Sequence, residues 1–314
     1  YFASHAISCR SCSARTLTNG TTQYHHVAVT PVLVAPGQDA VFPLPPAFVA
    51  PQDGHLKQDC ELVASTRWLA QWAPRIAPWG VTCLGDDLYC HQPFCQQVLA
   101  QGCHFLFVCL PQSHPARYAW LADFERNATV PTRVATRWTG TQRLTETYRY
   151  CHHLPLRDSD DALYVDWCEL TTTDATGRVL FRNAWATSHT VTAETVVAIA
   201  AAGRSRWKIE NENNNTLKTK GYHFEHNYGH GKQHLSTVLA TLILLAYLVH
   251  TTLDRLDPRY RAVRAQLPSR QTFFEHLRAL VQYLPFDSWD HLFDFMLDGL
   301  RPAPRNVRER PNTG

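Results

Sequence analysis

The chain has 314 residues, of which 45% are hydrophobic and 18% charged, and its formal net charge is +3 at neutral pH. This composition excludes an intrinsically disordered protein, and the length is sufficient for one elaborated domain or two. The net charge is too small to identify a nucleic-acid-binding protein by itself. It understates the local charge, because Arg and Lys gather in residues 204–220 and 301–309 and the 17 His become cationic below neutral pH.

The cellular location is predicted from two patterns that are not seen in the sequence, a secretory signal and a membrane span. No secretory signal is visible, and the longest apolar run, residues 238–249, is shorter than the ~20 residues that a bilayer span requires. We therefore expect a buried core helix in that run, no membrane partner and a cytoplasmic protein. The ten Cys are expected to be free thiols, because a chain of this size folds without disulfide bonds.

Cysteines and histidines near the start have the spacing of metal ligands. Cys9 and Cys12 are separated by two residues, and His25 and His26 follow a turn at Asn19-Gly20. This pattern is compatible with a tetrahedral, structural zinc site formed by Cys9, Cys12 and one or both histidines. The alternative is a β-hairpin with two reduced cysteines and surface histidines.

Further along, the patterns of apolar residues indicate a mixed α/β chain. Residues 24–35 and 40–49 are punctuated by Pro and predict antiparallel strands with an exposed edge. The next expected elements are a helix at 60–73 that ends before Pro74, a strand at 81–84, a helix at 93–100 and a buried strand at 103–110.

The second half divides into three regions. Residues 133–190 alternate Thr, Arg, Tyr and Trp and predict a β-meander. From Thr192 onward the pattern is helical, with breaks at Pro258, Pro268 and Pro285, and residues 301–314 are expected to be disordered. The resulting division is residues 1–130, 131–190, 191–300 and 301–314.

The segment from Arg206 to Lys218 is the most informative part of the sequence. Arg206 and Glu210 are four residues apart, so on a helix they share one face, and Asn213 and Leu217 continue that stripe. Lys218 would lie about 80° round the same side. A carboxylate between cations and amides can hold a divalent metal while its neighbours bind phosphate oxygens. The alternative is a solvated helix with an Arg–Glu pair worth only a few tenths of a kcal/mol.

A second candidate carboxylate follows the apolar run at residues 81–84, which is typical of a buried strand. Asp86 and Asp87 come directly after Gly85, at the C-terminal end of this strand, where α/β sheets bind ligands. The alternative is a strand-to-helix turn with Asp87 as the N-cap, and both roles can hold together.

Residues 206–210, Arg-Trp-Lys-Ile-Glu, with Leu217 and Lys218 following, resemble the Tyr-Arg-Glu-Lys signature of bacterial insertion-sequence transposases. These are DDE enzymes with a ribonuclease-H-like core. Two departures indicate a divergent branch: Gly203 stands where the signature has Tyr, and the Lys falls one residue later than usual. The resemblance extends over nearly the whole chain, but only this signature is specific.

The resemblance implies an α/β fold, namely a ribonuclease-H-like mixed sheet flanked by helices. The β-rich residues 131–190 would be inserted between the core and the Glu-bearing helix. The order of the elements up to residue 110, three strands, a helix, a strand, a helix and a strand, matches such a sheet apart from its start. Glu210 would be the third metal-binding carboxylate and Asp86 the second, because the Asp-x-x-Tyr register favours Asp86 over Asp87.

The first Asp of the triad is expected a few positions upstream of Tyr1, which would make the chain an N-terminally truncated fragment. In the resembling proteins this Asp precedes a segment similar to residues 1–4. Asp59 and Glu61 are weaker candidates within the chain, because they look like part of the helix at 60–73.

The function implied by the resemblance is metal-dependent cleavage and strand transfer of the DNA of a mobile element. Asp86 and Glu210 would hold Mg²⁺ or Mn²⁺. The partner would be DNA, bound by a homodimer or higher oligomer in the nucleoid-associated cytoplasm of a bacterium. The rival interpretations are a truncated or decayed, non-catalytic DNA-binding remnant and a hydrolase of the same fold. The expected DNA-contacting residues are Arg204, Arg206, Lys208, Asn214, Lys218 and Lys220.

Overall fold

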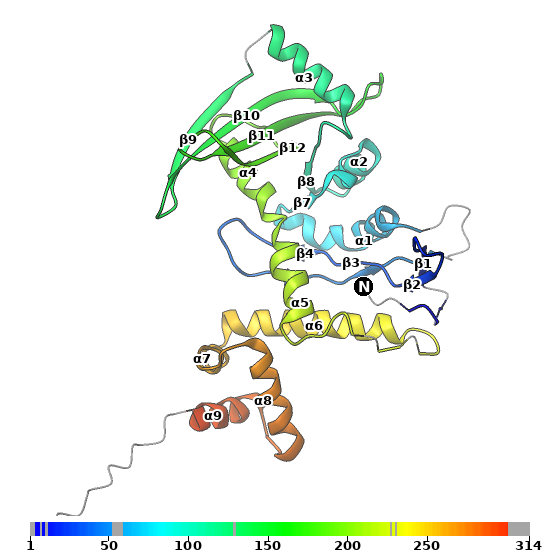
Figure 1. The fold of residues 1–314 in the computed structure, drawn as a ribbon, viewed down its shortest axis with the longest axis vertical. Coiled ribbons are helices and arrows are strands. Elements are labelled where there is room, and N and C mark those ends of the chain that lie inside the picture. The colour runs from blue at the N-terminus through cyan, green and yellow to red at the C-terminus, as the bar shows by residue number, and fades with distance from the viewer. Residues whose placement is uncertain are drawn as a thin grey trace, which may run out of the picture.

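A six-stranded mixed sheet occupies one end of an elongated molecule (Figure 1). The strand order is β7-β8-β12-β11-β10-β9. β7 and β8 run parallel, and the other neighbouring pairs are antiparallel. The strands are β7 Thr82–Gly85, β8 His104–Val108, β9 Thr132–Trp138, β10 Arg143–Pro155, β11 Tyr164–Thr173 and β12 Val179–Thr187.

The structure is a computed structural model that describes residues 4–6, 8–9, 12–51, 59–127, 130–226, 228–229 and 231–300. Its mixed α/β architecture, with a mixed sheet flanked by helices, is the predicted fold class and is compatible with a ribonuclease-H-like fold. The tail at residues 301–314, which we expected to be disordered, lies outside the described residues.

Helices cover both faces of the sheet. On one face, Phe105, Phe107 and Trp167 pack into a core with α1 (Glu61–Ile76), α2 (Gln92–Ala100) and α3 (Pro115–Asn127). On the other face, Leu106, Val108 and Trp185 pack against α4 (Val196–Ser205). Since β8 is covered on both faces, it is apolar at nearly every position instead of alternating.

The β-meander predicted at residues 133–190 is confirmed, and it continues the central sheet. Its last strand, β12, pairs with β8 through Trp185 opposite Val108 and Thr187 opposite Leu106. The region between the core and the Glu-bearing helix is therefore joined to the core by backbone hydrogen bonds. It does not form a sheet of its own.

The N-terminal strands are antiparallel, as predicted, but none of them joins the central sheet among the described residues. The expected order of a ribonuclease-H-like sheet is therefore wrong for this part of the chain. Prolines at positions 31, 36, 43, 45 and 46 remove backbone donors and limit four of the strands to two residues. The pairs are β1 Ser13–Thr16 with β2 Thr22–His25, β3 Ala28–Val29 with β6 Ala47–Phe48, and β4 Val32–Leu33 with β5 Phe42–Pro43.

Two helices differ from the sequence prediction. α1 continues through Pro74 to Ile76, where we expected it to end before the proline. Pro74 lies in the last turn, so its missing N–H removes a hydrogen bond only at the end of the helix, and the Ala77 amide still donates to the Ala73 carbonyl. α3 was not anticipated, because its apolar residues have weak helical periodicity.

The C-terminal region is helical, and its helices break at the predicted prolines. Pro258 opens α7, Pro268 follows the end of α7, and Pro285 follows the end of α8. A second apolar core lies among these helices, separate from the sheet. They are α5 Asn215–Thr219, α6 Leu235–Leu256, α7 Pro258–Gln266, α8 Arg270–Tyr283 and α9 Trp289–Leu300.

Helix α6 corrects the expectation of a buried core helix at residues 238–249. It has 22 residues, and only 17% of its most apolar 18-residue window is buried. Its length and hydropathy are sufficient to cross a membrane, but one such helix is weak evidence, since core helices of soluble proteins meet the same criterion. Leu244 and Tyr247 pack into the C-terminal core, which is compatible with a soluble protein.

A half-buried histidine packs against the aromatic rings of that C-terminal core. His250 lies against the ring of Phe274, with centroids 4.9 Å apart, and its Nδ1 is 3.0 Å from the Tyr260 hydroxyl. Burial lowers the pKa of His250 to about 4, and the positive charges of Arg270 and Arg264 act in the same direction. The imidazole is therefore neutral in the folded protein at neutral pH.

Acidification is expected to destabilise this core through His250. The unfolded chain takes up the proton near pH 6.5, whereas the folded chain resists it down to about pH 4. The unfolded state therefore binds more protons in this window, and the free energy of unfolding falls as the pH is lowered through it, by about 1 to 3 kcal/mol. His250→Gln keeps a hydrogen-bonding partner for Tyr260 but does not titrate. Urea unfolding at pH 7.5 and pH 5 should show a smaller loss for this variant, and an equal loss would contradict the assignment.

Candidate functional site

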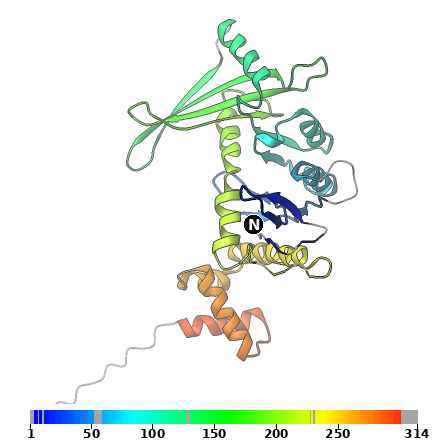
Figure 2. The same cartoon turned by 45° about the vertical axis from the view of Figure 1, so that its right-hand side comes forward.

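The predicted signature lies on a helical rod that connects the sheet to α6 (Figure 1). α4 ends at Ser205, a tight turn follows, residues Ile209–Asn214 form a π-helix, and α5 completes the rod. The turn is visible in i→i+3 bonds, such as that from the Glu210 amide to the Trp207 carbonyl. Figure 2 shows the rod from another side, running in yellow-green from the sheet to the yellow α6. Short π-helical segments are rare and occur frequently at functional sites.

Glu210 lies on the π-helix and projects into solvent. Its Oε1 accepts a hydrogen bond of 3.1 Å from Nη1 of Arg206, the pairing predicted from their spacing. The stripe does not continue as expected, because Asn213 and Leu217 are fully buried whereas 45% of the Glu210 side chain is exposed. The π-helix winds more loosely than an α-helix, so 100° per residue does not hold across it.

Two of the predicted DNA-binding lysines are held within the molecule. Nζ of Lys218 is 2.8 Å from Oε1 of Glu225, and this hydrogen bond holds the pKa of the Glu225 carboxyl below its usual value. Nζ of Lys208 donates to the carbonyl of Ala35 at 2.9 Å and also to that of Gln38. Lys208 therefore connects the signature to the N-terminal loops.

The other predicted DNA-binding residues differ in their surroundings. The guanidinium of Arg204 lies over the Phe181 ring, 4.9 Å from its centroid, and Nη1 is 3.8 Å from Glu146. Asn214 is half-buried and accepts a hydrogen bond from Asn213, while Lys220 is exposed.

A concave surface runs along one side of the rod, with a volume of about 410 Å³. It brings together three of the six predicted DNA-binding residues and Trp207. Trp207 was not predicted from the sequence as a functional residue, although 55% of it is exposed. The sequence did contain a sign of its role, because this aromatic residue stands between two basic residues, Arg206 and Lys208. The concave surface is lined by Phe181, Asn183, Gly203, Arg204, Arg206, Trp207, Lys208, Asn211 and Glu212.

The two aspartates at the end of β7 have separate contacts. Asp86 is exposed, and its Oδ1 accepts a hydrogen bond of 3.1 Å from the amide of Leu88, so Asp86 caps the short helix that follows. The interpretation of Asp87 as this cap is therefore wrong. Oδ1 of Asp87 instead accepts from the Leu110 amide at 2.7 Å and lies 3.4 Å from Nε2 of His114.

The elements next to Asp86 and Glu210 share a cavity, although the two carboxylates themselves do not line it. Arg206 and Ile209 from the signature line a cavity of about 180 Å³ together with residues Thr82, Cys83 and Leu84 of β7. β7 ends one residue before Asp86, and Ile209 directly precedes Glu210. The fold thus places the two segments that carry the predicted carboxylates side by side, although they are far apart in the sequence.

Both in-chain candidates for the first carboxylate have hydrogen-bond partners within the molecule. The side chain of Asp59 is fully buried and bonded to the guanidinium of Arg67 and the amide of Ala50. Burial opposes its ionisation, but these hydrogen bonds outweigh burial and lower the pKa of Asp59. Glu61 accepts a hydrogen bond of 2.6 Å from the Tyr89 hydroxyl.

Two clusters of possible metal ligands occur in the described part of the chain. Cys9, Cys12 and His26 come together as the spacing predicts, whereas His25 does not join them. The second cluster, at Cys90, Cys109 and His114, was not predicted. No disulfide bond joins any of the ten cysteines, in agreement with the expectation of reduced thiols.

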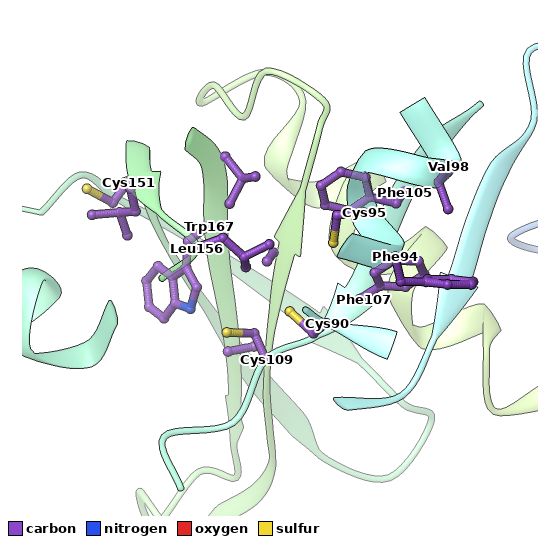
Figure 3. Packing of buried hydrophobic residues seen from close by; sticks show 14 of the residues in the cluster. Cys90, Phe94, Cys95, Val98, Phe105, Phe107, Cys109, Cys151, Leu156 and Trp167 are labelled. Atoms are coloured by element: carbon purple, nitrogen blue, oxygen red, sulfur yellow. The ribbon is translucent and has the colours of Figure 1, made fainter. Parts of the chain in front are cut away.

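The second cluster is buried in the core beneath the sheet. Cys90 and Cys109 lie close together among phenylalanines (Figure 3), and both are completely inaccessible to solvent. Arg117, only 1% exposed, places Nη1 3.4 Å from Sγ of Cys109. A hydrogen bond from Cys90 and the nearby guanidinium lower the pKa of the Cys109 thiol despite its burial. Arg117 thus supplies the positive charge here, which disfavours a metal cation at the same point.

Neither a family model nor a curated protein sequence matches this chain. The assignment of function therefore depends on the residues and on where the fold places them.

Proposed function

We propose that this chain is a DDE transposase that cleaves and joins the DNA of a mobile element with divalent metal ions. The observation that supports the proposal is the shared cavity in which Thr82, Cys83 and Leu84 of β7 meet Arg206 and Ile209 of the signature segment, since Asp86 and Glu210 directly follow these two segments in the sequence. The enzyme would act on DNA as a homodimer or higher oligomer in the nucleoid-associated cytoplasm of a bacterium.

The residues present suit Mg²⁺ or Mn²⁺. Asp86 and Glu210 carry carboxylate oxygens, which are the ligands that hard cations prefer. Both side chains are exposed, so a cation can bind there without a large loss of its hydration. When bound, two such ions activate the attacking water or 3′-hydroxyl and stabilise the leaving oxygen of an in-line displacement. Arg206 holds Glu210 in place and presents positive charge beside it, where a phosphate of the cleaved strand would lie.

The concave surface beside the rod suits a DNA strand. Arg204 and Arg206 supply positive charge for phosphates, and the exposed ring of Trp207 supplies a face on which a base can stack. Asn214 and the exposed Lys220 extend the proposed contact along the rod toward α6, whereas Lys208 and Lys218 would contact phosphates only by exchanging their present partners.

A non-catalytic DNA-binding remnant is the second candidate. It is favoured by Asp59, whose side chain is fully buried against Arg67 and offers no exposed oxygen to a metal. Lys218 is paired with Glu225, which offsets its positive charge. The remnant would bind DNA without cleaving it.

Replacing each of the two aspartates in turn by asparagine tests the transposase against the non-catalytic remnant. The assay follows nicking of a duplex that carries the DNA flanking the gene, in Mg²⁺ or Mn²⁺, with protein expressed from the start codon of its reading frame. Asp86→Asn is expected to abolish nicking without unfolding the protein, because Asn caps helices as well as Asp does. Asp87→Asn keeps an oxygen for the Leu110 amide and should be far milder.

Three other outcomes would count against the assignment. If the two aspartate variants trade places, the metal ligand is Asp87 and not Asp86. If both variants nick normally, the strand end is not the site. If the unmodified protein binds the duplex but does not nick it with either metal, the non-catalytic remnant is favoured.

A further inference from the structure

The start of the chain forms a hairpin that has few apolar contacts of its own. β1 and β2 pair over four residues, from Ser13 opposite His25 to Thr16 opposite Thr22. Three of the four residues of β1 are exposed, and none of those in β2 is fully buried. An isolated two-stranded hairpin of this kind is at best marginally stable in water. The folded hairpin therefore needs stabilisation from something other than its own apolar contacts.

The ends of this hairpin bring three ligand atoms together. Because Ser13 is opposite His25, the residues just outside the ladder, Cys12 and His26, also face each other. A tight turn, in which the Cys12 amide donates to the Cys9 carbonyl at 3.0 Å, returns Cys9 to the same point. The two sulfurs are 3.4 Å apart, and each is 3.5 Å from Nε2 of His26.

The sulfur–nitrogen separations are close to the edges of a zinc tetrahedron, and the sulfur–sulfur separation is about 0.4 Å shorter than such an edge. With Zn–S near 2.3 Å and Zn–N near 2.1 Å, tetrahedral angles place two sulfurs about 3.8 Å apart and a sulfur and a nitrogen about 3.6 Å apart. A disulfide would instead bring the sulfurs to about 2.05 Å. We propose that Cys9, Cys12 and His26 bind a structural Zn²⁺ that closes the β1–β2 hairpin. Two thiolates and an imidazole are the donors that Zn²⁺ prefers over Mg²⁺.

The extended backbone also determines which of the two histidines can bind the zinc. His25 and His26 are consecutive in an extended segment, so their side chains project to opposite sides, and only one of them can meet the cysteines. The fold selects His26. This matters beyond the hairpin, because His26 lines a cavity of about 300 Å³ together with Asn214 and Lys218 of the signature rod. The zinc would thus fix one wall of a cavity whose other wall carries proposed DNA-binding residues.

The test measures metal directly, so its result is independent of transposase activity. Intact protein, purified without chelators, should contain about one zinc per chain by plasma mass spectrometry. Cys9→Ser, Cys12→Ser and His26→Ala should each lose that zinc. His25→Ala is the matched control, since it removes the neighbouring imidazole and should retain the metal. Cys90→Ala should also retain it, because Cys90 belongs to the other cluster.

A second measurement keeps the proposal testable if the variants do not fold. Unmodified protein loaded with Co²⁺ should show the charge-transfer absorption of thiolate ligands, and a mercurial that blocks thiols should release bound zinc to a metal-sensitive dye. Absence of zinc and of cobalt absorption in folded, unmodified protein would overturn the proposal. So would retention of zinc by folded His26→Ala, or a loss of zinc caused by Cys90→Ala and not by Cys9→Ser.

Discussion

Glu210→Gln is expected to abolish metal-dependent cleavage while leaving DNA binding intact. Gln keeps the shape of the side chain and an oxygen for Arg206, but it loses the charge that holds a hard cation. Altering residues that only hydrogen-bond to the ligands of a metal already lowers metal affinity or activity by about 10- to 100-fold, so removal of a direct ligand should lower the cleavage rate by at least about 100-fold. Removing an anion beside phosphates cannot weaken electrostatic attraction to DNA. The measurements are cleavage of end-labelled duplex and a binding isotherm.

Two other residues provide the controls for this prediction. Glu275 is exposed on α8 and does not line the concave surface, so Glu275→Gln makes the same chemical change and should cleave normally. Arg206→Ala should lower binding and cleavage together and reduce the dependence of binding on salt. Near-full cleavage by Glu210→Gln, or an equal loss in Glu275→Gln, would show that Glu210 does not act as the metal ligand.

Gly203→Ala is expected to destabilise the protein, although Ala is normally the better residue in a helix. A Cβ at position 203 would lie 2.6 Å from Cε2 and Nε1 of Trp185, which is buried in the sheet and cannot move aside. Overpacking of this kind costs about 1–3 kcal/mol, which exceeds the gain in helix propensity of up to about 1 kcal/mol. The expected net loss is about 1–2 kcal/mol in the free energy of unfolding, measured with urea.

Gly299 is the matched control for this substitution. It also lies in a helix, α9, but a Cβ there would meet no atom within 4 Å. Gly299→Ala should therefore be neutral or slightly stabilising. If Gly203→Ala stabilises the protein to the same extent, the contact with Trp185 is looser than the fold implies. A larger side chain, such as an aromatic ring, would have even less room at position 203.

The strands and the ends of most helices could be predicted from the sequence, because their signals are local. The apolar run of β8 and the prolines after α6, α7 and α8 each act on their own segment. The pairing of β12 with β8 could not be predicted, because register depends on contacts between residues about 80 apart. For the same reason, the sequence did not show that the proline-rich N-terminal strands stay outside the central sheet.

For the signature segment, the sequence predicted neighbours along a helix but not their geometry. The spacing of Arg206 and Glu210 correctly predicted that they are neighbours, and their ion pair is the one expected from the alternative interpretation, a solvated helix. A π-helix cannot be recognised from the spacing of apolar residues, so the predicted stripe through Asn213 and Leu217 was wrong. Alternation along an extended segment, in contrast, would have been sufficient to show that His25 and His26 cannot both face the cysteines.

The outer edge of β7 bears on which ligands can complete the proposed metal site. β7 is the last strand of the sheet in the described part of the chain, so its outer edge offers unpaired backbone groups along a cavity lined by Val32, Leu33 and Val34. A further strand that hydrogen-bonds to this edge would lie about 4.8 Å from β7. A carboxylate at the end of such a strand would lie near the metal that we propose at Asp86. The edge thus provides a place at which backbone pairing alone could complete a set of metal ligands.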